Sequence, residues 1–139
     1  KMCEMAGGLV VADRYCFGSM PGREEIPLEE GKDILQSIAD YYMWRNQCPR
    51  AMGPENIIAR KRYIFDLAEK YHADGIIVEN MKFCEFWSYE KVLASHILTE
   101  EMGVPCCTIE KEYALGSVGQ LRTRFQAFVE SLEIKKINS

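Results

Sequence analysis

Three cysteines stand where a thiol can do chemistry, and Cys84 is the strongest candidate. Cys84 follows the apolar run at residues 75–80, which is typical of a buried parallel strand, and it precedes a segment that opens a helix. In open α/β sheets, ligands gather beyond the carboxyl ends of the strands. A thiol at such a strand-to-helix turn can act as a nucleophile, a redox group or a metal ligand. The alternative is that Cys84 packs as a small buried hydrophobe.

Cys16 and Cys48 are the weaker candidates. Cys16 follows the first apolar run, and Cys48 precedes Pro49 in a segment that interrupts a helical pattern. The three cysteines are spread singly, whereas zinc ligands usually come in pairs two to four residues apart. Dispersed cysteines can hold an iron–sulfur cluster where their loops converge. We therefore keep all three as candidate metal ligands, and an open cluster on three thiolates could take some of its ligands from outside this chain.

The remaining cysteines and both histidines are expected to be structural. Cys106 and Cys107 lie within a predicted strand with both faces covered, and Cys3 lies in a short helical segment, so core packing is the simplest role for them. His72 and His96 lie in predicted helices, and neither has an acidic partner nearby in the sequence that would indicate catalysis.

The start of the last predicted helix is a candidate anion site. Ser-Val-Gly-Gln at residues 117–120 fits the capping-box pattern. The free N–H groups at a helix N-terminus attract an anion. Ser117, Gly119, Gln120 and Arg122 are therefore candidate substrate-binding residues. The alternative is that Ser117 and Gln120 only cap the helix.

The elements that must position these residues follow from the hydrophobic pattern. Three short apolar runs predict strands, at residues 9–12, 76–80 and 106–110. Apolar residues at helical spacing predict four helices, over about residues 28–45, 54–72, 88–102 and 117–133. Strands that are apolar throughout and alternate with helices indicate a parallel sheet with helices on both faces. The predicted fold class is α/β, a three-layer flavodoxin- or Rossmann-like sheet that is incomplete at its N-terminus.

Residues 1–139 are expected to form one C-terminal α/β domain of a larger subunit. Three strands are few for a doubly wound sheet, and residues 1–6 read as the last turn of a helix that Gly7 and Gly8 end. A βαβ unit without its first strand would look this way.

Composition excludes several classes of protein. The chain has 139 residues, of which 47% are hydrophobic, so it can form a globular core. The net charge of −4 argues against a nucleic-acid partner. No apolar stretch approaches the roughly 20 residues of a transmembrane helix, so no membrane association is expected. Six cysteines, without a signal-peptide pattern at the start, indicate a reducing compartment, and we expect the cytoplasm.

Three motifs together resemble one enzyme family. They are Lys-Phe-Cys at residues 82–84, Glu-Lys-Glu-Tyr at 110–113 and Gly-Gln-Leu-Arg-Thr-Arg at 119–124; residues 8–13 and Cys48-Pro49 fit the same pattern. The chain is similar, over nearly its whole length, to the carboxyl-terminal part of 2-hydroxyacyl-CoA dehydratase and benzoyl-CoA reductase subunits. Within this family it most resembles the alpha-type subunit of 2-hydroxyglutaryl-CoA dehydratase.

The resemblance implies a [4Fe–4S] cluster held by three cysteines, with Cys84 aligned to the cluster cysteine of the Lys-Phe-Cys motif. It implies two protein partners, a second dehydratase subunit and an ATP-dependent iron–sulfur activator protein. The implied substrate is an (R)-2-hydroxyacyl-CoA, which loses water by a ketyl-radical route. Because the other ligands lie mostly upstream in the family, this chain alone is expected to hold no stable cluster and to be inactive. The alternatives are a benzoyl-CoA reductase-type subunit and a non-catalytic module that packs against a partner subunit.

Overall fold

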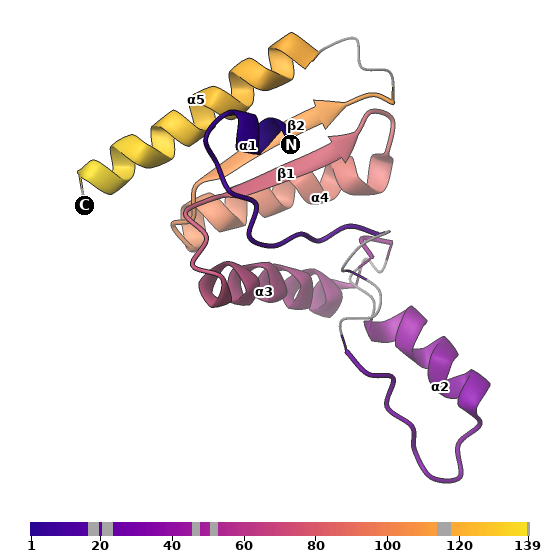
Figure 1. Ribbon diagram of the computed structural model, residues 1–139. Coiled ribbons are helices and arrows are strands. Elements are labelled where there is room, and N and C mark those ends of the chain that lie inside the picture. The colour runs from indigo at the N-terminus through magenta and orange to yellow at the C-terminus, as the bar shows by residue number, and fades with distance from the viewer. Residues whose placement is uncertain (17–19, 21–23, 46–47, 51–52, 114–117, 139) are drawn as a thin grey trace. The chain divides into compact units, whose positions relative to one another are not determined.

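The computed structural model describes residues 1–16, 20, 24–45, 48–50, 53–113 and 118–138 (Figure 1). The chain divides into two compact units. One consists of Lys1–Ala12 with Lys61–Ser139, and the other of Asp13–Arg60. In the described part of the chain, no helix is both long enough and apolar enough to cross a membrane.

A two-stranded parallel sheet lies at the centre of the larger unit. Strand β1 (Ile76–Met81) pairs with β2 (Cys106–Lys111), with Ile76 opposite Cys106 and Met81 opposite Lys111. Both strands fall where the apolar runs predicted them, and their parallel pairing confirms the α/β class. Whether the fold is a three-layer, flavodoxin-like sheet stays a prediction.

Helix α4 (Glu85–His96) connects the two strands and packs against one face of the sheet. It continues as a π-helical segment, Ile97–Glu101, which ends the crossover before β2. The sequence predicted this helix from about residue 88. It begins earlier because Cys84, in an extended conformation, serves as its N-cap.

Helix α5 (Val118–Ile137) follows β2 and belongs to the same unit. Phe125 and Val129 are its buried residues. Gly75 lies directly under this helix, because a Cβ atom built there would meet the ring of Phe128 at 2.8 Å and Leu132 at 3.0 Å. The short helix α1 (Met2–Met5) also packs against α5 and ends as predicted, with Gly7 at a φ of +92°.

The predicted strand at residues 9–12 is wrong. This segment is not a strand in the structure, and Leu9 is 78% exposed. A strand is stabilised by hydrogen bonds to a neighbouring strand, and an apolar run without such a neighbour gains nothing from the extended ladder. Among the described residues, the sheet therefore has two strands rather than the predicted three.

The smaller unit contains helix α2 (Ile34–Asp40), which continues as a π-helical segment, Tyr41–Arg45. The sequence predicted a helix from about residue 28. The chain instead turns at Gly31, whose φ is +84°, and the helix starts where the Asp33 carboxylate accepts a hydrogen bond from the Leu35 N–H at 2.7 Å. Helix α3 (Pro54–Lys70) starts at Pro54 as predicted, and the division between the two units falls within it.

Candidate functional site at the carboxyl edge of the sheet

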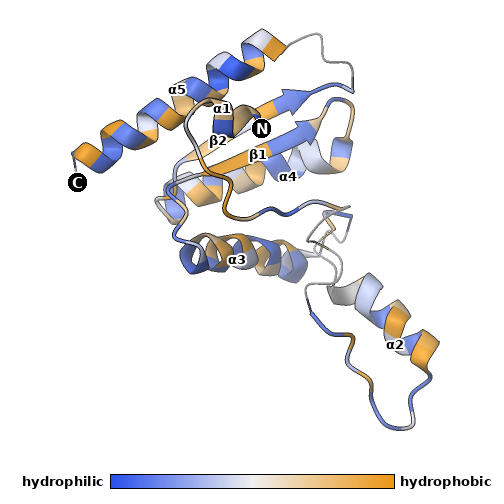
Figure 2. Ribbon diagram, in the orientation of Figure 1, coloured by the Kyte–Doolittle hydropathy of each residue, from blue (hydrophilic) through white to orange (hydrophobic). Residues whose placement is uncertain are grey.

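Both strands become polar toward their carboxyl ends. Figure 2 shows the change from hydrophobic to hydrophilic along β1 and β2, and Figure 1 shows both strands pointing toward the same edge. This carboxyl edge is where an open parallel sheet places its ligands. The chemistry-bearing residues at this edge come from the turn after β1 and from the residues that follow β2.

The turn between β1 and α4 is fixed by backbone hydrogen bonds. The Lys82 N–H donates to the Lys111 carbonyl at 2.8 Å, which extends the pairing of the strands by one residue. The Cys84 N–H donates to the Met81 carbonyl at 3.0 Å and closes the turn. Between them, Phe83 has a φ of +68°, in the left-handed region that β-carbon-bearing residues avoid, and its side chain is 90% exposed. The turn therefore holds a strained backbone immediately before Cys84.

Cys84 is a half-buried free thiol at the N-cap of α4. Its backbone is extended, with φ −88° and ψ 94°, and its side chain makes no capping hydrogen bond with the helix. An N-cap side chain usually accepts from the first free N–H groups of its helix. The sulfur of Cys84 makes no such hydrogen bond, so it remains available to a ligand.

Lysine and glutamate side chains pair around the same edge. Lys82 pairs with Glu112, and this carboxylate raises the pKa of Lys82 above its ordinary value. Lys111 pairs with Glu79 across the strands. These pairs are partly exposed, so they contribute little to stability. The positive charges at this edge are therefore partly balanced by carboxylates before any anion approaches.

The other two predicted metal ligands lie in the smaller unit. Cys16 is exposed and Cys48 is half-buried, and both are free thiols. Among the described residues, no three His, Cys, Asp or Glu side chains come together in a group that could hold a metal ion. The ligand set of Cys84, Cys48 and Cys16 therefore stays a prediction.

Cys106 and Cys107 lie at the opposite, amino end of the sheet, where β2 begins. Burial raises the pKa of both thiols, and Cys106 forms a hydrogen bond with Ser95 of α4. A buried, protonated thiol is a poor ligand and a poor nucleophile. Their partial burial in the sheet agrees with the structural role predicted for them.

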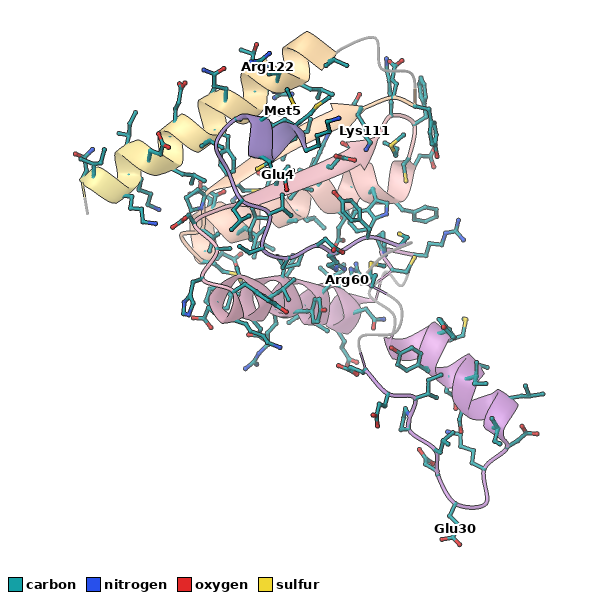
Figure 3. The ribbon with its side chains drawn as sticks, viewed as in Figure 1. Glu4, Met5, Glu30, Arg60, Lys111 and Arg122 are labelled. Atoms are coloured by element: carbon teal, nitrogen blue, oxygen red, sulfur yellow. The ribbon has the colours of Figure 1, made fainter. Side chains whose placement is uncertain are left out.

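The predicted anion site is described in part. Ser117 lies outside the described residues, whereas Gly119, Gln120 and Arg122 are exposed on the first turns of α5. Figure 1 shows α5 beginning near the edge to which β1 and β2 point, and Figure 3 shows Arg122 on that half of the helix. The binding role of Gly119, Gln120, Arg122 and Ser117 stays a prediction.

Sequence reasoning missed the pair formed by Asn80 and Ser88. Asn80 lies in β1 with 2% of its surface exposed, and its Nδ2 donates to the Ser88 hydroxyl at 3.0 Å. The signal was present, because a polar amide inside an apolar strand costs stability unless it has a partner or a role. The partner could not be read from the pattern, since it lies eight residues away across a turn.

The fold and this edge define an α/β protein with an available thiol where such proteins bind ligands. The chain matches the family described as "2-hydroxyglutaryl-CoA dehydratase, D-component" over residues 1–132, and it belongs to this family. The family-level resemblance drawn from the three motifs is thereby confirmed.

Curated relatives agree with this assignment. The chain is 30% identical to the (R)-phenyllactyl-CoA dehydratase beta subunit of Clostridium sporogenes over 132 residues. These residues cover 95% of this chain and 34% of that protein. It is 32% identical to the lactoyl-CoA dehydratase subunit beta of Anaerotignum propionicum over 91 residues. These residues cover 64% of this chain and 24% of that protein. The protein YjiM of Escherichia coli (strain K12) is 28% identical over 135 residues, which is 95% of this chain and 33% of YjiM.

The chain spans about a third or less of the length of these relatives. Two of them are named as beta subunits, so the alpha-type likeness gains no support from them. Both names describe one subunit of a dehydratase.

Proposed function

We propose that this chain is part of a subunit of a 2-hydroxyacyl-CoA dehydratase, and that Cys84 supplies one thiolate ligand of a [4Fe–4S] cluster in the assembled enzyme. The observation that carries the proposal is the state of Cys84. It is a half-buried free thiol at the carboxyl edge of a parallel sheet, and its side chain does not cap its own helix. Membership of the dehydratase family supports the same class of reaction.

The donor set fits a shared site better than a complete one. Among the described cysteines of the larger unit, Cys84 directly follows the carboxyl end of a strand, whereas Cys106 and Cys107 lie at the other end of β2 and Cys3 lies in α1. An open [4Fe–4S] cluster needs about three thiolates. The remaining ligands must come from other segments of the protein, and Cys48 and Cys16 stay candidates for two of them.

When bound, such a cluster supplies low-potential electrons and an iron position that can act as a Lewis acid. The chain's own contribution is to hold the thiolate in place. The β1–α4 turn fixes the Cys84 backbone at both its N–H and its carbonyl group. The exposed first turns of α5, with Gly119, Gln120 and Arg122, would bind an anionic group of an (R)-2-hydroxyacyl-CoA substrate.

Iron content tests the proposal directly. Cys84→Ser is compared with Cys106→Ser, since both replace a half-buried thiol by a hydroxyl at opposite ends of the same sheet. In the intact protein, purified without oxygen, Cys84→Ser is expected to lose most of its cluster iron and visible charge-transfer absorption. Cys106→Ser is expected to keep both. Iron content unchanged in Cys84→Ser would show that this thiol is not a ligand.

Turnover separates the alternatives. With the partner subunit, the ATP-dependent activator and ATP present, the intact enzyme is expected to dehydrate a 2-hydroxyacyl-CoA. Reduction of benzoyl-CoA instead would identify a reductase-type subunit. Intact wild-type protein without iron would favour a module that only packs against its partner.

A further inference from the structure

Asn80 is a polar residue whose presence in β1 is not explained by packing. It is 2% exposed, and its Oδ1 atom is buried without a hydrogen-bond partner among the described residues. A buried, unpaired carbonyl oxygen destabilises the folded state, and an apolar residue of the same size would avoid this cost. The amide must therefore do something that an apolar side chain could not.

The contacts of Asn80 reach both groups that hold the backbone of Cys84. The Cys84 N–H donates to the Met81 carbonyl at 3.0 Å, and the Cys84 carbonyl accepts from the Ser88 N–H at 2.9 Å. The Asn80 Nδ2 donates to the Ser88 hydroxyl at 3.0 Å and makes a longer contact with the Met81 carbonyl at 3.4 Å. One buried side chain thus joins the end of the strand to the first turn of the helix, on both sides of the thiol.

The strained residue beside Cys84 makes this bridge necessary. Phe83 has a φ of +68°, and its exposed side chain has little packing to hold it there. A backbone conformation of this kind persists only where the surrounding contacts fix it. Without the bridge from Asn80 to Ser88, the turn can relax toward an unstrained conformation, and Cys84 would move with it.

We infer that Asn80 is a positioning residue: through Ser88, it holds the Cys84 thiolate in the orientation in which that sulfur binds the cluster. This inference rests on the proposed function. The role it assigns to the Asn80–Ser88 pair is to position Cys84 rather than to stabilise the fold. Neither residue is required to touch the cluster or the substrate.

Four variants separate positioning from stability. Asn80→Leu keeps the branched side-chain skeleton and removes the amide. Ser88→Ala removes the hydroxyl group that accepts the hydrogen bond from Asn80 Nδ2. Ser95→Ala is the matched control, because Ser95 lies on the same helix and forms a hydrogen bond with Cys106 at the other end of the sheet. Ser88→Thr retains the hydroxyl and is expected to behave as wild type.

The first measurement needs no cluster. In iron-free intact protein, hydrogen exchange at the Cys84 N–H and alkylation of its thiol by iodoacetamide are measured under native conditions. Both rates are expected to rise about five-fold in Asn80→Leu and in Ser88→Ala, as the loss of one ordinary hydrogen bond predicts. Ser95→Ala is expected to leave both rates unchanged. The urea midpoint of each variant is measured beside these rates, so that a change confined to the turn is distinguished from a loss of overall stability.

The second measurement uses the cluster-loaded enzyme. The electron paramagnetic resonance spectrum and the reduction potential of the cluster are expected to shift in Asn80→Leu and Ser88→Ala, and to stay at wild-type values in Ser95→Ala and Ser88→Thr. Wild-type exchange and alkylation rates in Asn80→Leu would overturn the inference. Altered rates with an unaltered spectrum would also overturn it, while loss of iron in Cys84→Ser would leave the proposed function standing. Full iron in Cys84→Ser would refute the proposed function itself.

Discussion

Two leucines give a sharp test of where the core of the larger unit lies. Leu98 is fully buried, with 0% of its surface exposed, whereas Leu9 is 78% exposed. Leu98→Ala removes a side chain whose burial is worth about 2–3 kcal/mol and leaves a cavity, so the expected loss is about 3–4 kcal/mol of unfolding free energy. Leu9→Ala removes the same atoms from a site that is about one-fifth buried, and the same reasoning gives about 0.5 kcal/mol.

The comparison is made by urea unfolding of residues 1–139, followed by circular dichroism. Leu98→Ala is expected to lower the midpoint strongly, and Leu9→Ala is expected to leave it nearly unchanged, with similar slopes for both variants. The hydrophobic pattern predicted that residues 9–12 form a buried strand, and in that case Leu9→Ala would cost as much as a core substitution. A loss above about 2 kcal/mol in Leu9→Ala would refute the exposed position of this segment.

Two further predictions concern the turn and the amino end of the sheet. Phe83→Gly is expected to raise the unfolding free energy by about 1 kcal/mol, because glycine adopts a φ of +68° without strain and the exposed ring makes little packing that could be lost. Calorimetry should show a higher melting temperature for this variant. A lower melting temperature would contradict the backbone strain at Phe83. Burial raises the pKa of Cys106 and Cys107 above the ordinary thiol value, so the folded state keeps their protons to higher pH than the unfolded state. Their contribution to stability is present below the ordinary thiol pKa and is lost as the pH rises through the raised values. As the pH rises through the ordinary thiol pKa, wild type is therefore expected to lose more unfolding free energy than a Cys106→Ala/Cys107→Ala variant, and equal losses would contradict the pKa shifts.

Local pattern was sufficient for the elements whose partners lie nearby in the sequence. The runs that form β1 and β2 are apolar, short and separated by a helical pattern, and a βαβ unit follows from that spacing. Residues 9–12 have the same composition but form no strand, because strand formation depends on a neighbour that composition does not reveal. The start of α2 was predicted too early for a different reason. The chain turns at Gly31, and the Asp33 carboxylate caps the helix at its first residues, so the helix cannot begin before Ile34.

The candidate site was predicted in part for a similar reason. Cys84 could be found because its position after a strand and before a helix is a property of the linear sequence. The contact between Asn80 and Ser88 could not, because it depends on the path of the turn and on the packing of α4 against β1. Ligands from separate segments are equally invisible to spacing rules, which is why Cys16 and Cys48 remain predictions.

Helix α5 is fastened mainly at its far end. Phe128 and Leu132 pack against Gly75 at the start of β1, and Lys135 donates to the Gly103 carbonyl in the turn before β2. Its opening residues, by contrast, are exposed. These contacts fix the C-terminal half of α5 at the amino end of the sheet, while its first turn, toward the edge that carries Cys84, is largely exposed. Substitutions at the Gly75 and Gly103 contacts should therefore lower the unfolding free energy of the unit, whereas substitutions at the exposed first turns of α5 should change it little.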